Sequence, residues 1–104
     1  MDRIRKLIEK IEKYGIDNNV PIMSKDTIIE LNKIINNEKV TSILEIGTAI
    51  GYSTICFANN ENIKKVISIE RDNLRYSIAK KNVLESNLSN IKLINDDAFN
   101  IEFN

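Results

Sequence analysis

The chain has 104 residues, enough for one domain but not for two, and 42% of them are hydrophobic, so it can build a core. Fifteen Lys and Arg balance fifteen Asp and Glu, and this zero net charge argues against a dedicated nucleic-acid clamp. One cysteine excludes an intrachain disulfide, and the lack of histidine removes the commonest metal ligand and general base. With no apolar run near the ~20 residues of a membrane span and no signal-peptide pattern at the N-terminus, we expect a cytoplasmic protein.

Two amphipathic helices are predicted at the start of the chain, within residues 1–36. The first covers residues 1–14, and we expect Gly15 to end it. Its basic side chains could contact RNA, but acids are mixed among them, which favours a solvated face. A linker over 16–23 contains the only proline, and Ser24 caps a second helix that runs to about residue 36. The expected buried stripes are Ile4, Leu7, Ile8 and Ile11 in the first helix, and Ile28, Leu31, Ile34 and Ile35 in the second.

Strands and helices alternate in the remainder of the chain, residues 40–104. Short β-rich runs at 40–46, 65–69 and 91–94 flank helices predicted over 52–59 and 72–86. This alternation predicts an α/β fold with right-handed crossovers and a parallel sheet. In the longer helix the expected buried positions include Leu74, Ile78, Val83 and Leu84, and Asn87 is a plausible left-handed terminator.

The most informative segment is the turn from the first strand into the following helix. It contains two of the three glycines in the chain, Gly47 and Gly51, which let the backbone approach a ligand without an intervening Cβ. In an open parallel sheet, ligands bind at the carboxyl ends of the strands, where this turn lies. A turn that needs its glycines for packing alone would have the same spacing, so this motif is weak by itself.

Acids at the ends of the next two strands strengthen the interpretation. Glu70 ends the second strand and can accept both hydroxyls of a ribose, while an acid of the pair Asp96-Asp97 can accept from an adenine amino group. Each could instead be an ordinary solvated or turn-forming acid. Three such elements at the ends of three consecutive strands nevertheless predict one nucleoside-sized pocket.

The spacing of the first turn separates two kinds of nucleotide fold. Glu45, Gly47 and Gly51 give the pattern Glu-x-Gly-x-x-x-Gly instead of the G-x-G-x-x-G of dinucleotide-binding domains. The stretch from Ile43 to Ser53 resembles motif I of class I S-adenosylmethionine (SAM) dependent methyltransferases, specifically the catechol-type O-methyltransferases and their bacterial relatives. Those relatives include enzymes that methylate 5-hydroxyuridine in tRNA. The resemblance extends over about residues 18–99.

This resemblance implies a role for each matching residue. The backbone near Gly47, Thr48 and Gly51 would border the methionine part of SAM, with Glu45 supporting the turn from beneath. The Ser53 hydroxyl and the backbone near Met23 would hold the methionine carboxylate. Glu70 would bind the ribose, and the implied adenine contacts are Arg71, Asp97 and Ala98. Asp96 stands where the family often has glycine, which leaves the choice between Asp96 and Asp97 open.

The family fold has seven strands, of which this chain supplies the first three, so we expect one incomplete SAM-binding domain over residues 1–104. Family ligands for a divalent metal such as Mg²⁺, and much of the acceptor pocket, lie on later strands. We therefore expect no metal ligands here and cannot name a catalytic base. The alternative is a SAM- or adenosine-binding module without turnover. The first strand would have a free apolar edge, so we expect self-association or a missing C-terminal half instead of a well-behaved monomer.

Overall fold

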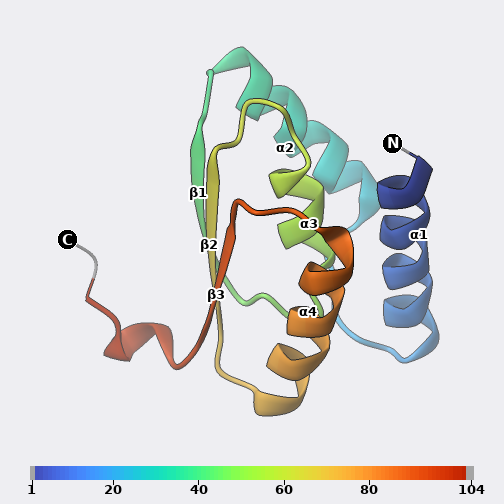
Figure 1. The fold of residues 1–104 in the computed structure, drawn as a ribbon, viewed down its shortest axis with the longest axis vertical. Coiled ribbons are helices and arrows are strands. Elements are labelled where there is room, and N and C mark those ends of the chain that lie inside the picture. Colours follow the sequence, from blue (N-terminus) through green and yellow to red (C-terminus); the bar gives the residue numbers. More distant parts are fainter. Residues whose placement is uncertain (1, 103–104) are drawn as a thin grey trace.

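Three parallel strands form the centre of the fold, as the alternation of strands and helices predicts. In the computed structural model, which describes residues 2–102 apart from the side chain of Asp2, they are β1 (Ser42–Ile46), β2 (Lys65–Glu70) and β3 (Ile91–Asn95). They lie in the spatial order β1-β2-β3, so β2 is central and pairs with both neighbours (Figure 1). The α/β fold class and the parallel sheet are confirmed.

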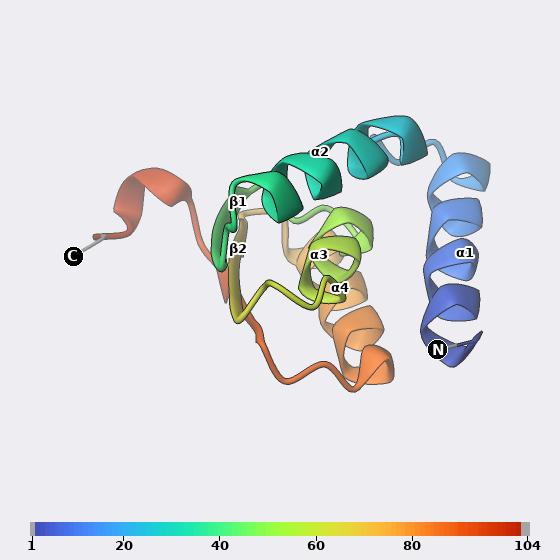
Figure 2. The ribbon, with the colours of Figure 1, turned by 90° about the horizontal axis from the view of Figure 1, so that it is seen from above.

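Four helices precede or connect the strands: α1 (Asp2–Asp17), α2 (Lys25–Asn37), α3 (Tyr52–Ala58) and α4 (Asn73–Ser86). A short 3₁₀ helix (Ala98–Asn100) follows β3. Figure 2 shows that α1 to α4 all lie on the same side of the sheet. The core forms between them and the sheet, around the fully buried Ile50, Ile55 and Val66.

The sequence correctly predicts two of three helix ends. Ser24 accepts a hydrogen bond from the Thr27 N–H at the start of α2, and Asn87 ends α4 in the left-handed conformation. The prediction that Gly15 ends the first helix is wrong, because α1 continues to Asp17. A Cβ on Gly15 would lie 3.1 Å from the Cδ1 atom of Ile22, so this glycine allows the linker to pack closely on α1.

The buried stripe predicted for α1 faces the core, with Leu7 and Ile11 buried and Ile4 and Ile8 half-buried, whereas the predictions for α2 and α4 are partly wrong. In α2, Ile28 and Ile35 are buried but Ile34 is 53% exposed. In α4, Leu74 and Leu84 are exposed, and the buried residues are Ala79 and Ser86. The reason is close packing: Ala79 lies against Gly51, where an added Cβ would be 3.5 Å from the Ala79 Cα. The helix therefore contacts its neighbours through a small residue and turns its leucines outward.

Candidate nucleotide-binding site

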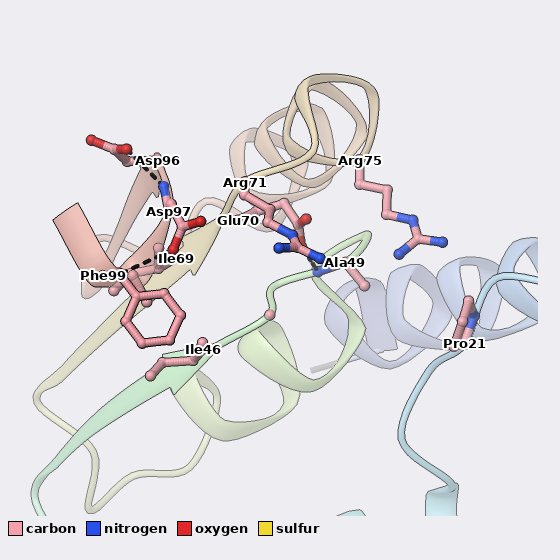
Figure 3. Close-up of a pocket in the computed structure, with 12 residues that line it drawn as sticks. Pro21, Ile46, Ala49, Ile69, Glu70, Arg71, Arg75, Asp96, Asp97 and Phe99 are labelled. Carbon is pink, nitrogen blue, oxygen red and sulfur yellow. Dashed lines mark hydrogen bonds between the residues drawn. The ribbon is translucent and has the colours of Figure 1, made fainter. Parts of the chain in front are cut away.

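A pocket of about 560 Å³ lies where the three strands end, at the edge of the sheet that the sequence predicts (Figure 3). Its walls come from the loops that follow β1, β2 and β3 and from the linker between α1 and α2. The lining residues are Pro21, Ile46, Gly47, Ala49, Ile69, Glu70, Arg71, Arg75, Asp96, Asp97, Ala98 and Phe99. The pocket therefore combines apolar side chains with three acids and two arginines.

Glu70 is the best-anchored charged group of the pocket. Its Oε1 accepts a hydrogen bond of 2.8 Å from the Ala49 N–H, and its Oε2 accepts one of 3.0 Å from the Asp72 N–H. The residue is only 6% exposed. A carboxylate has about four acceptor positions, so each oxygen keeps the capacity for one further donor. Two adjacent hydroxyls, such as those of a ribose, match that arrangement.

The two glycines of the β1–α3 turn serve different purposes. Both adopt positive φ values, +96° for Gly47 and +91° for Gly51, which L side chains rarely adopt. A Cβ on Gly47 would meet nothing within 4 Å, whereas Gly51 faces Ala79 and does not line the pocket. The N–H groups of Gly47 and Thr48 both donate to the Ile69 carbonyl. Gly47 thus leaves open space at the pocket, and Gly51 permits helix packing.

Glu45 lies at the centre of a polar network beneath this turn. Its carboxylate accepts hydrogen bonds from the hydroxyls of Ser53, Thr54 and Ser68, the last at 2.7 Å. Ser68 also bonds Thr48 at 2.6 Å. Glu45 therefore ties β1 to both β2 and α3. The resemblance assigns the Ser53 hydroxyl to the methionine carboxylate, but in this structure that hydroxyl donates a hydrogen bond to Glu45.

A second, smaller pocket of about 140 Å³ adjoins the first. Pro21, Ile46, Gly47 and Ala49 line both. The second pocket also gathers Met23, Thr48 and Ser53, which the resemblance assigns to the methionine end of SAM, and Glu45, which it assigns to support of the turn. The predicted ribose and adenine residues line the first pocket, so nine of the ten predicted positions fall into two adjacent groups, and the tenth, Gly51, lines neither pocket.

The two aspartates after β3 differ in exposure. Asp96 is exposed, and its Oδ1 accepts from the Asp97 N–H and from the side-chain amide of Asn100. Asp97 is half-buried, and its Oδ1 accepts from the Phe99 N–H at 3.0 Å, which begins the 3₁₀ helix. Both aspartates line the pocket. The capping role is the one that the sequence offers as the alternative to adenine binding.

Six lining residues of the larger pocket were not predicted: Pro21, Ile46, Ala49, Ile69, Arg75 and Phe99. Arg75 lies one helical turn beyond Arg71, and Figure 3 shows its side chain between α4 and Pro21. Within the described part of the chain, neither guanidinium has a hydrogen-bond or ion-pair partner. The signal that could have found Arg75 is its place in the first turn of α4, close after the end of β2. Phe99, which is 98% exposed, has no such signal.

Helix α3 carries Tyr52, which lines the smaller pocket, and Cys56, one helical turn further on. Burial, followed by the charges of Glu12 and Glu45, raises the pKa of the Cys56 thiol to about 12. Burial also raises the pKa of Tyr52, whose hydroxyl donates to Glu12 at 3.3 Å. Both groups stay neutral at physiological pH, so neither is an activated nucleophile.

Residues 2–102 contain neither a metal-binding cluster nor a membrane-spanning helix. No group of three or more Cys, Asp and Glu side chains there could hold a metal ion. In the same residues, no helix is long and apolar enough to span a bilayer.

Comparisons with known proteins agree with this geometry. The family model described as protein-L-isoaspartate(D-aspartate) O-methyltransferase (PCMT) matches residues 5–100. A protein assigned as ribosomal RNA small subunit methyltransferase A from Methanosphaera stadtmanae is 38% identical over 90% of this chain and 31% of its own length.

Solved structures give the same result. A protein assigned as a caffeoyl-CoA O-methyltransferase from Staphylococcus aureus aligns with a TM-score of 0.84 and 34% identity, over 89% of this chain and 45% of that one. An O-methyltransferase from Bacillus cereus, solved in complex with SAH, aligns with a TM-score of 0.77 and 25% identity, over 90% and 44% of the two chains. The chain thus spans about a third to a half of the length of these relatives.

Proposed function

Because this chain belongs to the PCMT family of methyltransferases, we propose that it is the SAM-binding half of an O-methyltransferase. The anchored carboxylate of Glu70, at the end of the central strand, is the observation that carries this proposal. SAM supplies an electrophilic methyl group on a sulfonium. Residues of this chain would bind and orient it.

The arrangement of the two pockets supports a specific orientation of SAM. With the ribose on Glu70, the adenine would lie toward Arg71, Asp97 and Ala98 in the larger pocket. The methionine would cross the open space at Gly47 and enter the smaller pocket, where Glu45 carries a negative charge beside the α-ammonium group. The Ser53 hydroxyl can bind the methionine carboxylate only by releasing Glu45, so we propose this contact as secondary.

Methyl transfer depends mainly on holding the sulfonium methyl in line with the acceptor oxygen. This half of the site contributes that positioning for the donor. An O-acceptor, which we propose as a small aromatic hydroxyl or a tRNA hydroxyuridine, needs deprotonation by groups outside it. The isoaspartyl acceptor named in the PCMT family and the RNA acceptors named in other relatives are the competing substrates.

Calorimetry with SAM, S-adenosylhomocysteine and NAD tests donor binding. We expect the first two to bind and NAD to bind far more weakly. Glu70→Gln should weaken SAM binding by roughly 10- to 100-fold, since a hydrogen bond to a charged group is worth about 1.5–3 kcal/mol. Glu61→Gln, an exposed acid outside both pockets, should bind like the wild type.

A change in the ligand separates the ribose contact from protein folding. S-Adenosylhomocysteine analogues that lack the 2′- or the 3′-hydroxyl should each lose affinity for the wild type. They should lose little further affinity for Glu70→Gln. Equal binding of the parent and deoxy ligands by the wild type would refute the ribose assignment.

The alternative is a SAM- or adenosine-binding module without turnover. Transfer of labelled methyl from SAM distinguishes the two functions. We would supply catechol, hydroxyuridine-containing tRNA or an isoaspartyl peptide, with and without Mg²⁺. Donor binding without labelled product on any acceptor supports the module.

A further inference from the structure

The turn between β1 and α3 contains one residue in a strained backbone conformation. Ala49 has a φ of +51°, in the left-handed region that residues with a side chain rarely adopt. Gly47 and Gly51 also have positive φ values, but glycine adopts them without a steric cost. Ala49 lines both pockets, so its conformation shapes the candidate site directly. A strained residue of this kind persists only where surrounding contacts hold it.

Two side chains hold the backbone on the two sides of Ala49. On one side, the Ala49 N–H donates to Glu70 at 2.8 Å (Figure 3). On the other side, the carbonyl of Ile50 accepts a hydrogen bond of 2.8 Å from the side-chain amide of Asn82. Ile50 is fully buried, and no backbone N–H among residues 2–102 donates to its carbonyl. Asn82 therefore satisfies a buried carbonyl that the turn leaves without a backbone partner.

Helix α4 contacts this turn at a second point, next to the first. Ala79 lies against Gly51 and Asn82 bonds Ile50, so two residues of α4 meet two consecutive residues of the turn. Residues three apart lie on the same face of a helix, as these two do. Asn82 itself is half-buried and lines neither pocket. Its influence on the site is therefore exerted through the backbone of the turn.

We propose that Asn82 is a positioning residue for the donor site. Its amide fixes the Ile50 carbonyl, which keeps Ala49 in the left-handed conformation and its N–H on Glu70 before any ligand binds. The Glu70 carboxylate is then already oriented when a ligand arrives, which lowers the cost of binding. The consequence for SAM rests on the proposed function, whereas the effect of Asn82 on the turn does not.

Amide hydrogen exchange of the ligand-free chain tests the effect on the turn. In Asn82→Ala, the Ala49 N–H should exchange at least about tenfold faster relative to the amides of β2, because the turn opens locally. Asn82→Leu has a similar side-chain volume but no donor, so it should show the same change, and it covers the case in which Asn82→Ala does not fold. Unchanged relative exchange in the folded variants would overturn the proposal.

Asn90→Ala is the matched control for a purely structural role. The Asn90 amide also donates to backbone carbonyls, those of Ala58 at 2.9 Å and Ile63 at 3.1 Å, but both lie outside the turn. Its loss should lower the unfolding midpoint while the relative exchange of Ala49 stays at the wild-type value. Equal changes in the Asn82 and Asn90 variants would mean that Asn82 acts only through global stability, and would also overturn the proposal.

Substitution of Ala49 by glycine connects the strained conformation to ligand affinity. Calorimetry with S-adenosylhomocysteine, at a temperature where all variants are folded, should show a loss of about tenfold for Asn82→Ala. In the presence of Ala49→Gly the same substitution should cost about threefold or less, because glycine adopts a positive φ without this support. Equal losses with and without Ala49→Gly would refute the role of Asn82 in holding Ala49. If the wild type does not bind S-adenosylhomocysteine, the proposed function fails, and the exchange measurements alone decide whether Asn82 positions the turn.

Discussion

Two carboxylates at the ends of neighbouring strands do different work in this site. Glu70 is held by two backbone N–H groups and faces the larger pocket. Glu45 is held by three side-chain hydroxyls and joins β1 to β2 and α3. The first is positioned for a ligand and the second mainly for the turn that surrounds it. Sequence spacing marks both acids, but only the partner atoms distinguish their roles.

Replacing Glu45 by glutamine should destabilise the fold. The amide keeps one acceptor oxygen but turns its NH₂ group toward hydroxyls that donate to the carboxylate. We expect a loss of about 1–3 kcal/mol in the free energy of unfolding, measured by urea denaturation. Glu61→Gln, at an exposed position, is the matched control and should change it by less than about 0.5 kcal/mol. Equal stability of the two variants would show that the hydrogen bonds on Glu45 do not stabilise the fold.

Some of the pocket residues could be predicted from their position in the sequence. Gly47 lies in a turn where its positive φ favours glycine, Glu70 lies at the end of β2, and both line the predicted pocket. The residue proposed to contact adenine could not be narrowed to one, because Asp96 and Asp97 are adjacent and only the fold shows that Asp97 is the half-buried one. The hydrogen bond from Ser53 to Glu45 was also beyond the sequence, since it depends on how α3 approaches β1.

Helix α1 contacts the remainder of the fold through a specific cap. The Arg3 guanidinium donates to the backbone carbonyls of Glu85, at 2.5 Å, and Ser86, at 2.7 Å, at the end of α4. Carbonyls in the last turn of a helix lack partners within it and carry partial negative charge. Arg3 satisfies two of them from a helix more than eighty residues away in sequence. Sequence periodicity predicted α1 but gave no indication of this contact.

Removing the Arg3 cap should loosen α1 from α4. For Arg3→Met, which keeps an unbranched stem, we expect a loss of about 1–2 kcal/mol in the free energy of unfolding. Lys6→Met is the control, because Lys6 is an exposed cation of the same helix with no such contact to α4. Urea denaturation measures the loss in the free energy of unfolding, and faster hydrogen exchange in α1 would show that the loss arises at that helix. A loss of the same size in both variants would mean that charge on α1, and not the cap, stabilises the contact.

Over the whole molecule, the order of elements and the parallel sheet follow from the sequence, because βαβ units have one favoured handedness. The side of the sheet that the helices cover, and the outward orientation of Leu74 and Leu84, do not follow from it. An amphipathic pattern shows that a face is apolar, but not whether the partner is present. Leu44 and Ile46 show this most clearly, since they are apolar strand residues that stay exposed.

Stability should fall in alkaline solution through the two neutral groups on α3. Burial raises the pKa of Cys56 from 9 to about 12, and raises that of Tyr52 above its ordinary value of 10. Both groups ionise more readily in the unfolded chain. Their contribution to stability is therefore complete below about pH 9 and is lost as pH rises toward 12. Ionisation of each group can lower the free energy of unfolding by up to about 1.4 kcal/mol per pH unit.

Urea denaturation between pH 7 and pH 11 tests this pH dependence. Cys56→Ala and Tyr52→Phe should each flatten the decline above pH 9 relative to the wild type, whatever their stability at pH 7. Tyr14→Phe, at a 43% exposed tyrosine, should leave the slope unchanged. All other ionisable groups are common to the compared variants, so the difference in slope isolates the group that was removed. Parallel curves for wild type and both α3 variants would contradict the prediction and show that these groups ionise as readily in the folded chain as in the unfolded one.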